Sequence, residues 1–275
     1  MTARRDTLAA LKGTLARLER GGMPPASPHA PSDGSGLVPL GAAGLDAALG
    51  GGIARAALHE VHAEAPVHVP AATGFTLGLA RRVAPAGPLV WVRQRFLDQE
   101  FGRPYGRGLA ALGLDPGAVV MVRVRDAEDA LRATLDAARC GAVGTVVADI
   151  WGAPKILDLT ASRRLSLAAA ESGVTVLMTR AGAEPEPSAA LSRWRVRGLA
   201  SEAAEGGMPG RPAFSVTLLR HRAGIPPRDW SMEWDREHGR FRERTALPGR
   251  LAPLPAERTA APPVEPQSIP FRRAG

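Results

Sequence analysis

The chain has 275 residues, 45% of them hydrophobic and 4% aromatic, so it can form one α/β core filled mainly by aliphatic side chains. Its formal net charge of +8 comes almost entirely from arginine, since Lys12 and Lys155 are the only lysines, and it favours nucleic acid or acidic partners. A single cysteine, Cys140, excludes an internal disulfide, and no apolar run reaches the ~20 residues of a membrane span, so we expect a cytoplasmic protein.

Residues 1–22 predict an amphipathic helix, and residues 23–36 predict a linker rich in Pro, Ser and Gly. The helix carries a stripe of leucines at 3-4-3 spacing: Leu8, Leu11, Leu15 and Leu18. Such a stripe needs an apolar groove. Two interpretations stay open: the helix packs on its own domain, or it docks on a neighbouring subunit or partner.

Residues 37–234 alternate apolar β-like runs with helical periodicity, which predicts a mostly parallel sheet with helices on both faces. The strands are expected at 57–62, 88–93, 118–124, 144–150 and 173–179. The helices are expected at 74–84, 105–112, 127–140 and 160–172. Two later runs, 192–199 and 213–222, alternate polar and apolar residues and predict an antiparallel extension at one edge. Residues 235–275 lose periodicity and predict a disordered, proline-rich tail.

The stretch "AATGFTLGLA", residues 71–80, is similar to the end of a phosphate-binding loop that enters a helix. That loop reads G-x-x-x-x-G-K-[ST], because glycine amides cradle phosphates, Lys neutralises them and the hydroxyl reaches Mg²⁺. Here Gly74 and Thr76 keep their spacing, Val69 replaces the first glycine and Phe75 replaces the lysine. We therefore expect a degenerate nucleotide site.

The order of motifs from about residue 38 to residue 222 resembles a RecA-type core. "VPLGAAGLDAALGGGIARAALHEVHA" is similar to that family's G-x-x-x-L-D-x-x-L-G-G-G segment and its following strand, and "ATGFTL" lines up with its phosphate loop. The resemblance implies that Asp149 stands in the Walker-B place, so it joins Gly74, Phe75 and Thr76 in the degenerate site. Asp149 could contact Mg²⁺, or it could bond to the next loop.

Three runs, "WVRQ", "PYGRGLAALGLDP" and "ALSRWRVRG", resemble ImuA-type proteins, the RecA/SulA-like members of the bacterial inducible mutagenesis cassette. This resemblance implies an adaptor in DNA-damage-induced translesion synthesis. Its partners would be a Y-family-polymerase-like protein (ImuB-type) and an error-prone replicative-type DNA polymerase. RecA or a second copy of the chain stay open as further partners. The resemblance also implies a cytoplasmic protein that reaches the nucleoid after DNA damage.

The missing lysine removes the main charge clamp of phosphoryl transfer, so we expect no ATP hydrolysis and no required cofactor. Weak binding of ATP with Mg²⁺ stays open, and we expect no metal site of the His/Cys type. Arg93 and Arg95 are interpreted as a solvated strand end or a basic patch. Two rival functions stay open: an ATP-dependent recombinase-type ATPase with an atypical phosphate loop, and a SulA-like inhibitor of cell division.

Direct contact with DNA is left open by the sequence. The segments 151–160 and 181–190, which the resemblance puts in the place of DNA-binding loops, are short, and Glu184 and Glu186 would repel phosphates. A surface for DNA or an acidic partner is expected instead at alternating arginines of one strand: Arg193, Arg195 and Arg197. A solvated strand face is the alternative.

Overall fold

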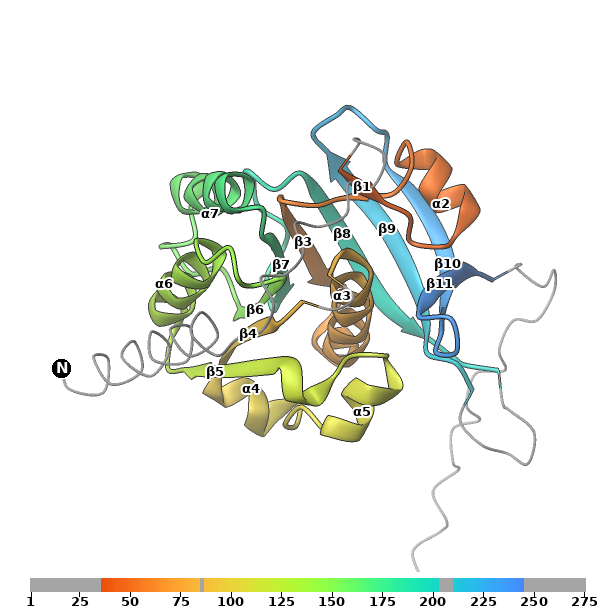
Figure 1. Cartoon of the computed structure of the whole chain (residues 1–275), viewed down its shortest axis with the longest axis horizontal. Helices are drawn as coiled ribbons and strands as arrows, with labels where there is room; N and C mark the ends of the chain where they lie inside the picture. Colours follow the sequence, from red (N-terminus) through yellow and green to blue (C-terminus); the bar gives the residue numbers. More distant parts are fainter. Residues whose placement is uncertain (1–35, 85–86, 203–209, 245–275) are drawn as a thin grey trace, which may run out of the picture. The chain divides into compact units, whose positions relative to one another are not determined.

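A computed structural model describes residues 36–84, 87–202 and 210–244 (Figure 1). Within these residues, nine strands form one mixed sheet in the order β11-β10-β9-β8-β3-β7-β6-β4-β5. A separate two-stranded pair joins β1 (Leu37–Val38) to β2 (Ile53–Ala54). Strands from distant parts of the sequence therefore lie side by side in one sheet.

Six adjacent strands of the sheet, from β8 to β5, run parallel to one another. In chain order they are β3 (Leu58–Ala63), β4 (Leu89–Gln94), β5 (Val119–Val124), β6 (Thr145–Trp151), β7 (Thr175–Ala181) and β8 (Ser192–Leu199). The four central strands β3, β7, β6 and β4 are almost entirely buried, as is typical of parallel strands covered on both faces, whereas β5 and β8 are partly exposed. The prediction of a mostly parallel sheet is confirmed.

The sheet continues beyond β8 as an antiparallel extension made of β9 (Ala213–His221), β10 (Arg228–Asp235) and β11 (Arg240–Glu243). The predicted extension is therefore confirmed, but its predicted end at residue 234 is wrong. The strand β11 lies inside the segment expected to be a tail. Phe241 explains the difference, because its fully buried ring holds the short, charged β11 on the core.

Helices cover both faces of the sheet, as predicted. On one face, α6 (Ala127–Ala138) and α7 (Leu159–Ser172) pack against β3, β4, β5, β6 and β7. On the other, α3 (Val69–Val83) packs against β3, β6, β7 and β8 (Figure 1). The side chains divide accordingly: Trp91 belongs to the core beside α3, and its neighbours Val90 and Val92 belong to the core beside α6 and α7.

Aspartates fix the starts of the two helices on the first face. The carboxylate of Asp126 accepts a hydrogen bond from the amide of Asp129 at 2.9 Å, and that of Asp158 accepts one from the amide of Ala161 at 2.7 Å. These caps satisfy amides that have no partner within the helix. The expected bounds at 127 and 160 are close to the observed starts for this reason.

Several short elements were not predicted: the helices α2 (Ala43–Ala48) and α4 (Arg95–Glu100), and the 3₁₀ turns η1 (Pro66–His68) and η2 (Pro116–Ala118). The short helix α5 (Gly106–Ala111) was expected, at residues 105–112. Asp46 explains the "GAAGLD" motif locally, since its two carboxylate oxygens accept hydrogen bonds from the amides of Leu40 at 2.6 Å and Gly41 at 2.8 Å. The motif therefore fixes a turn.

Some predictions fall outside the described residues. These are the leucine-striped helix of residues 1–22, the linker as far as residue 35, and the chain from residue 245 onward. Among the described helices, none combines the length and the hydropathy that crossing a membrane demands.

Candidate functional site

The segment that resembles a phosphate-binding loop is helical. The helix α3 begins at Val69, five residues earlier than predicted, so Gly74 lies in its second turn. Pro70 occupies the first turn and has no N–H to offer. A phosphate cradle needs several free backbone amides in a loop, whereas amides inside a helix bond to the preceding turn. The expected degenerate loop is corrected to an early helix start.

Phe75, in the place of the lysine, is a core residue. Its side chain is fully buried, and its ring centroid lies 5.1 Å from that of Phe241 and 6.1 Å from that of Phe214. Trp194 adds a third ring at 6.2 Å. Aromatic pairs at such separations add to the stability gained by burial. Phe75 therefore joins α3 to the antiparallel extension.

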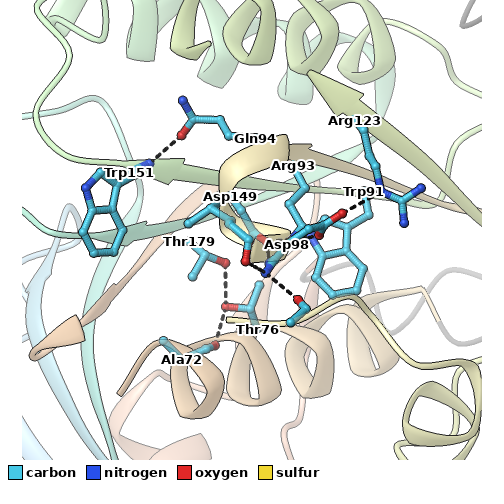
Figure 2. A network of polar contacts seen from close by, with 12 residues as sticks. Ala72, Thr76, Trp91, Arg93, Gln94, Asp98, Arg123, Asp149, Trp151 and Thr179 are labelled. Atoms are coloured by element: carbon cyan, nitrogen blue, oxygen red, sulfur yellow. Dashed lines mark hydrogen bonds and ion pairs between the residues drawn. The ribbon is translucent and has the colours of Figure 1, made fainter. Parts of the chain in front are cut away.

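Thr76 also faces the interior (Figure 2). Its hydroxyl donates to the carbonyl of Ala72 at 2.8 Å, and it accepts a hydrogen bond from the hydroxyl of Thr179 at 3.3 Å. Neither oxygen points to solvent, since Thr76 is completely buried and Thr179 is 4% exposed. The residue with the spacing of a Mg²⁺ ligand is thus used to join α3 to β7.

Asp149 is held by an internal cation. Its Oδ2 accepts hydrogen bonds from Nη1 of Arg93 at 2.5 Å and from Nε1 of Trp91 at 2.9 Å (Figure 2). Burial raises the pKa of Asp149, and the guanidinium of Arg93 counteracts that rise. Arg93 itself is 3% exposed, so its interpretation as a solvated strand end or free basic patch is wrong. Arg95 is exposed.

The ion pair is part of a longer chain of alternating charges. Nε of Arg93 donates to Oδ1 of Asp98 at 2.9 Å, and Nε of Arg123 donates to Oδ2 of the same carboxylate at 2.8 Å. Two carbonyls, those of Leu97 and Gly102, accept from Nη2 of Arg93. A buried ion pair is stabilising only when its remaining polar atoms are also bonded. Arg93 meets this condition, whereas Oδ1 of Asp149 is buried and has no hydrogen-bond partner among the described residues.

A neighbouring hydrogen bond joins the last residues of β4 and β6. The amide of Trp151 donates to Oε1 of Gln94 at 2.8 Å (Figure 2). The ring of Trp151 then packs on Phe96 and Phe101, with centroids 5.9 Å and 5.6 Å away. No sequence pattern predicted these contacts. Arg93 and Asp149 are register partners on adjacent strands, which only the sheet order reveals.

The three arginines of β8 have different surroundings. Arg193 is 8% exposed, and its Nε donates to Oε2 of Glu60 at 3.1 Å. Burial disfavours the charged form of Glu60, but His62 and Arg193 together lower its pKa. Arg193 is therefore a buried ion-pair residue and is removed from the predicted surface.

Arg195 and Arg197 remain on that surface as half-exposed side chains. Each has an acidic neighbour: Nη2 of Arg195 lies 3.6 Å from Oε2 of Glu184, and Nε of Arg197 lies 3.9 Å from Oε2 of Glu64. Trp194 and Val196, which alternate with them, are fully buried on the other face. The expected alternation is present, and its charges are partly balanced.

The described residues bring one group of possible metal ligands together, at the turn between β10 and β11. Ligand atoms of Asp235, Glu237 and His238 lie within 4.8 Å of one another. The carboxylate of Asp235 is already bonded to Nδ1 of His238 at 2.9 Å, and Nη1 of Arg242 lies 3.8 Å away. These contacts give the three residues a structural role, in which they hold the turn between β10 and β11.

A cleft of about 380 Å³ lies beside the α3 segment. One wall is α3, with Val69, Thr73 and Gly74. The other wall is the loop and helix that follow β4, where Tyr105 is 64% exposed. The cleft is lined by Gly74, one of the predicted nucleotide residues.

ATP and Mg²⁺, which the RecA-type resemblance implies, do not fit these residues. No loop of free amides precedes α3, the hydroxyl of Thr76 is buried, and Arg93 occupies the carboxylate of Asp149. Mg²⁺ needs accessible oxygen ligands, and phosphates need donors or cations. We therefore assign no step of chemistry to a bound nucleotide. The sequence matches no model of a known protein family, and no curated protein matches it.

Proposed function

We propose that the chain is a RecA-like adaptor that supports DNA-damage-induced translesion synthesis without hydrolysing ATP. Its partners would be the ImuB-type, Y-family-polymerase-like protein and, through it, an error-prone replicative-type polymerase. This function requires a cytoplasmic protein that reaches the nucleoid after DNA damage. The basis is the resemblance to a RecA-type core over residues 38–222 and to ImuA-type proteins in the runs "WVRQ", "PYGRGLAALGLDP" and "ALSRWRVRG". An α/β sheet whose strands occur in the expected order along the chain supports it.

The buried ion pair between Arg93 and Asp149 carries the part of the proposal that concerns ATP. In phosphoryl transfer the Walker-B carboxylate serves a metal ion that bridges phosphate oxygens. Here an arginine of the same sheet already neutralises the carboxylate, and both side chains are almost completely buried. With Phe75 in place of the lysine, neither half of the charge clamp is available.

An ATPase assay tests this part of the proposal. The purified full chain should release phosphate from ATP with Mg²⁺ no faster than two control variants, Thr76→Ala and Asp149→Asn. Turnover that is clearly faster in the wild-type chain than in both variants would overturn the proposal and favour the atypical ATPase.

A co-purification experiment tests the adaptor role. Tagged full chain, recovered from cells after DNA damage, should bring down the polymerase-like partner. The double variant Leu11→Asp and Leu15→Asp places charges in the leucine stripe and should abolish recovery if the helix docks on that partner. Recovery of neither polymerase by the wild-type chain, with filamentous cells on overexpression and an unchanged mutation frequency, would favour a SulA-like inhibitor instead.

A further inference from the structure

The cleft beside α3 is mainly apolar and is open at one side. Its floor and walls include Val69, Leu77, Trp91, Phe101 and Leu109. At about 380 Å³ it lies within the usual size range of small binding clefts, which are roughly 300–1,000 Å³. Large aromatic and aliphatic side chains gain most from such a site, because burial of apolar surface is the main favourable contribution.

The charges around the cleft all have one sign. The residues that line it include two arginines and no carboxylate. Arg93, at its base, is neutralised by Asp149 and Asp98. Arg103, at its rim, is exposed and forms no ion pair with any described acidic residue. One unneutralised cation therefore stands beside an apolar cleft, on a chain whose net charge is +8.

The backbone at the cleft is unsuited to a phosphate chain but open to a side chain. The start of α3 presents Pro70, which has no N–H, and Val69. On the opposite wall, Gly108 leaves space, since a Cβ placed on it would meet nothing closer than Cδ1 of Tyr105 at 3.8 Å. An apolar side chain therefore fits the cleft better than a nucleotide does.

We propose that this cleft is a docking site for an acidic segment of a partner protein, which inserts one aromatic or long aliphatic side chain and pairs a carboxylate with Arg103. The proposal rests on the proposed function, because an adaptor needs a surface for its partner. Complementary charge selects the acidic segment and speeds its encounter with a basic chain. The apolar anchor supplies the affinity and fixes the position of the segment.

A fluorescein-labelled peptide, DEDFLDED, tests the proposal by fluorescence anisotropy with the full chain. We expect a Kd of about 10–100 µM, which weakens several-fold between 50 and 300 mM NaCl. Two matched peptides separate the contributions: DEDSSDED keeps the charge without the anchor, and KRKFLKRK keeps the anchor with the opposite charge. Both should bind at least fivefold more weakly. Equal binding of DEDSSDED and DEDFLDED would overturn the proposed anchor.

Three variants place the peptide on the protein. Gly108→Phe should fill the cleft and weaken DEDFLDED at least tenfold, and its Cβ would meet no side chain closer than Tyr105, at 3.8 Å. Arg103→Glu should weaken it at least fivefold. Arg220→Glu makes the same change in net charge at an exposed arginine of β9 and should leave the affinity unchanged within twofold. Equal losses in the two Arg→Glu variants would show attraction by net charge alone, and this would overturn the site.

Competition with nucleotide gives a further decisive outcome. ATP with Mg²⁺ at 1 mM should not displace the peptide. Displacement of DEDFLDED from the wild-type chain by ATP with Mg²⁺, at constant ionic strength, would show that nucleotide takes the cleft and would overturn the proposal. The binding assay contains no hydrolysis step, so ATP turnover in the separate assay would count against the proposed function, whereas loss of specific peptide binding counts against the cleft.

Discussion

The two sides of the candidate site differ in the polarity of their buried side chains. On the α3 side, Phe75 replaces the lysine of a phosphate loop and packs among aromatic rings. On the side formed by β4 and β6, the aspartate is kept, but Arg93 is its internal counter-ion. One side is therefore apolar and the other is charged but self-neutralised. The comparison shows that a retained acidic residue says little about function until its partner is known.

The largest effect is expected on the apolar side. Phe75→Lys would restore the lysine of the phosphate-loop motif, but it would place an ammonium group among buried aromatic rings. Truncating a buried Phe already costs about 3–5 kcal/mol, and the buried charge adds to that cost. We expect a loss of about 4 kcal/mol or more in the free energy of unfolding, measured by urea denaturation, and no gain of ATPase activity.

Phe75→Leu is the matched control for this substitution. It stays apolar and of similar size, so the loss should be about 1–2 kcal/mol. If Phe75→Lys were as stable as Phe75→Leu, the ring would not be a core residue and the contrast between the two sides would disappear.

On the charged side, Arg93→Met should cost about 3–5 kcal/mol, because it leaves a buried carboxylate without its cation. Urea unfolding at two pH values also checks the sign. Burial raises the folded-state pKa of Asp149 even beside Arg93, and removing Arg93 takes away the largest interaction that lowers it, so the pKa rises further above its unfolded value. A carboxyl group with a raised folded-state pKa lowers the free energy of unfolding as the pH rises, so the variant's loss of stability should be smaller at pH 5 than at pH 8.

A double variant sharpens this prediction. Arg93→Met with Asp149→Leu removes both charges and should recover most of the lost stability, since apolar replacements of buried ion pairs are often neutral. A deficit in Arg93→Met that stays the same at both pH values would show that Asp149 is not the group left uncompensated.

A third effect, of intermediate size, is expected at His59, whose buried ring forms hydrogen bonds with Ser192 and Ala54. Nε2 of His59 donates to the carbonyl of Ala54 at 2.9 Å, and the hydroxyl of Ser192 donates to Nδ1 at 2.6 Å, which fits an uncharged ring. Burial lowers the pKa of His59 from 6.5 to about 4. Because the folded-state pKa is depressed, the stability it contributes is complete above pH 6.5 and is lost as the pH falls towards 4.

We expect this loss to be about 3 kcal/mol between pH 7 and pH 4. His59→Gln removes the titrating ring, so urea unfolding should show a smaller fall for the variant than for the wild-type chain over that range. Parallel curves for the two proteins would mean that His59 keeps a normal pKa in the fold.

The smallest effects are expected at the half-exposed arginines of β8. Arg195→Ala and Arg197→Ala should each change the free energy of unfolding by less than about 1 kcal/mol, because exposed ion pairs contribute little. Since Glu184 and Glu64 partly balance these charges, the double variant should also bind single-stranded DNA as the wild-type chain does. A weaker salt dependence of DNA binding in the double variant would instead assign this face to phosphate contacts.

The elements that the sequence predicts well are those fixed by local physics. The valine-rich runs and the capped helices α6 and α7 lie within about two residues of their predicted bounds, because apolar periodicity and aspartate caps act over short distances. The early start of α3 was missed because the glycine spacing of the motif suggested a loop.

The site itself could be predicted only in part. The absence of the lysine could be recognised from the motif, because Phe75 stands in its place. The pairing of Arg93 with Asp149, and of Arg193 with Glu60, depends on which strands are neighbours, and residues 56 or 133 positions apart give no local signal. The strand β11 was missed for a similar reason: its buried residue Phe241 packs on Phe75 of α3, which is far away in the sequence.

The close approach of α3 to β11 sets a practical limit on where the protein can be shortened. A Cβ on Gly78 would lie only 2.6 Å from the ring of Phe241, so helix and strand touch with no spare room. A chain that stopped at residue 234 would lose this covering strand and leave Phe75 facing water. Expression of the folded domain alone should therefore extend at least to Arg244, whose amide bonds to Ser231.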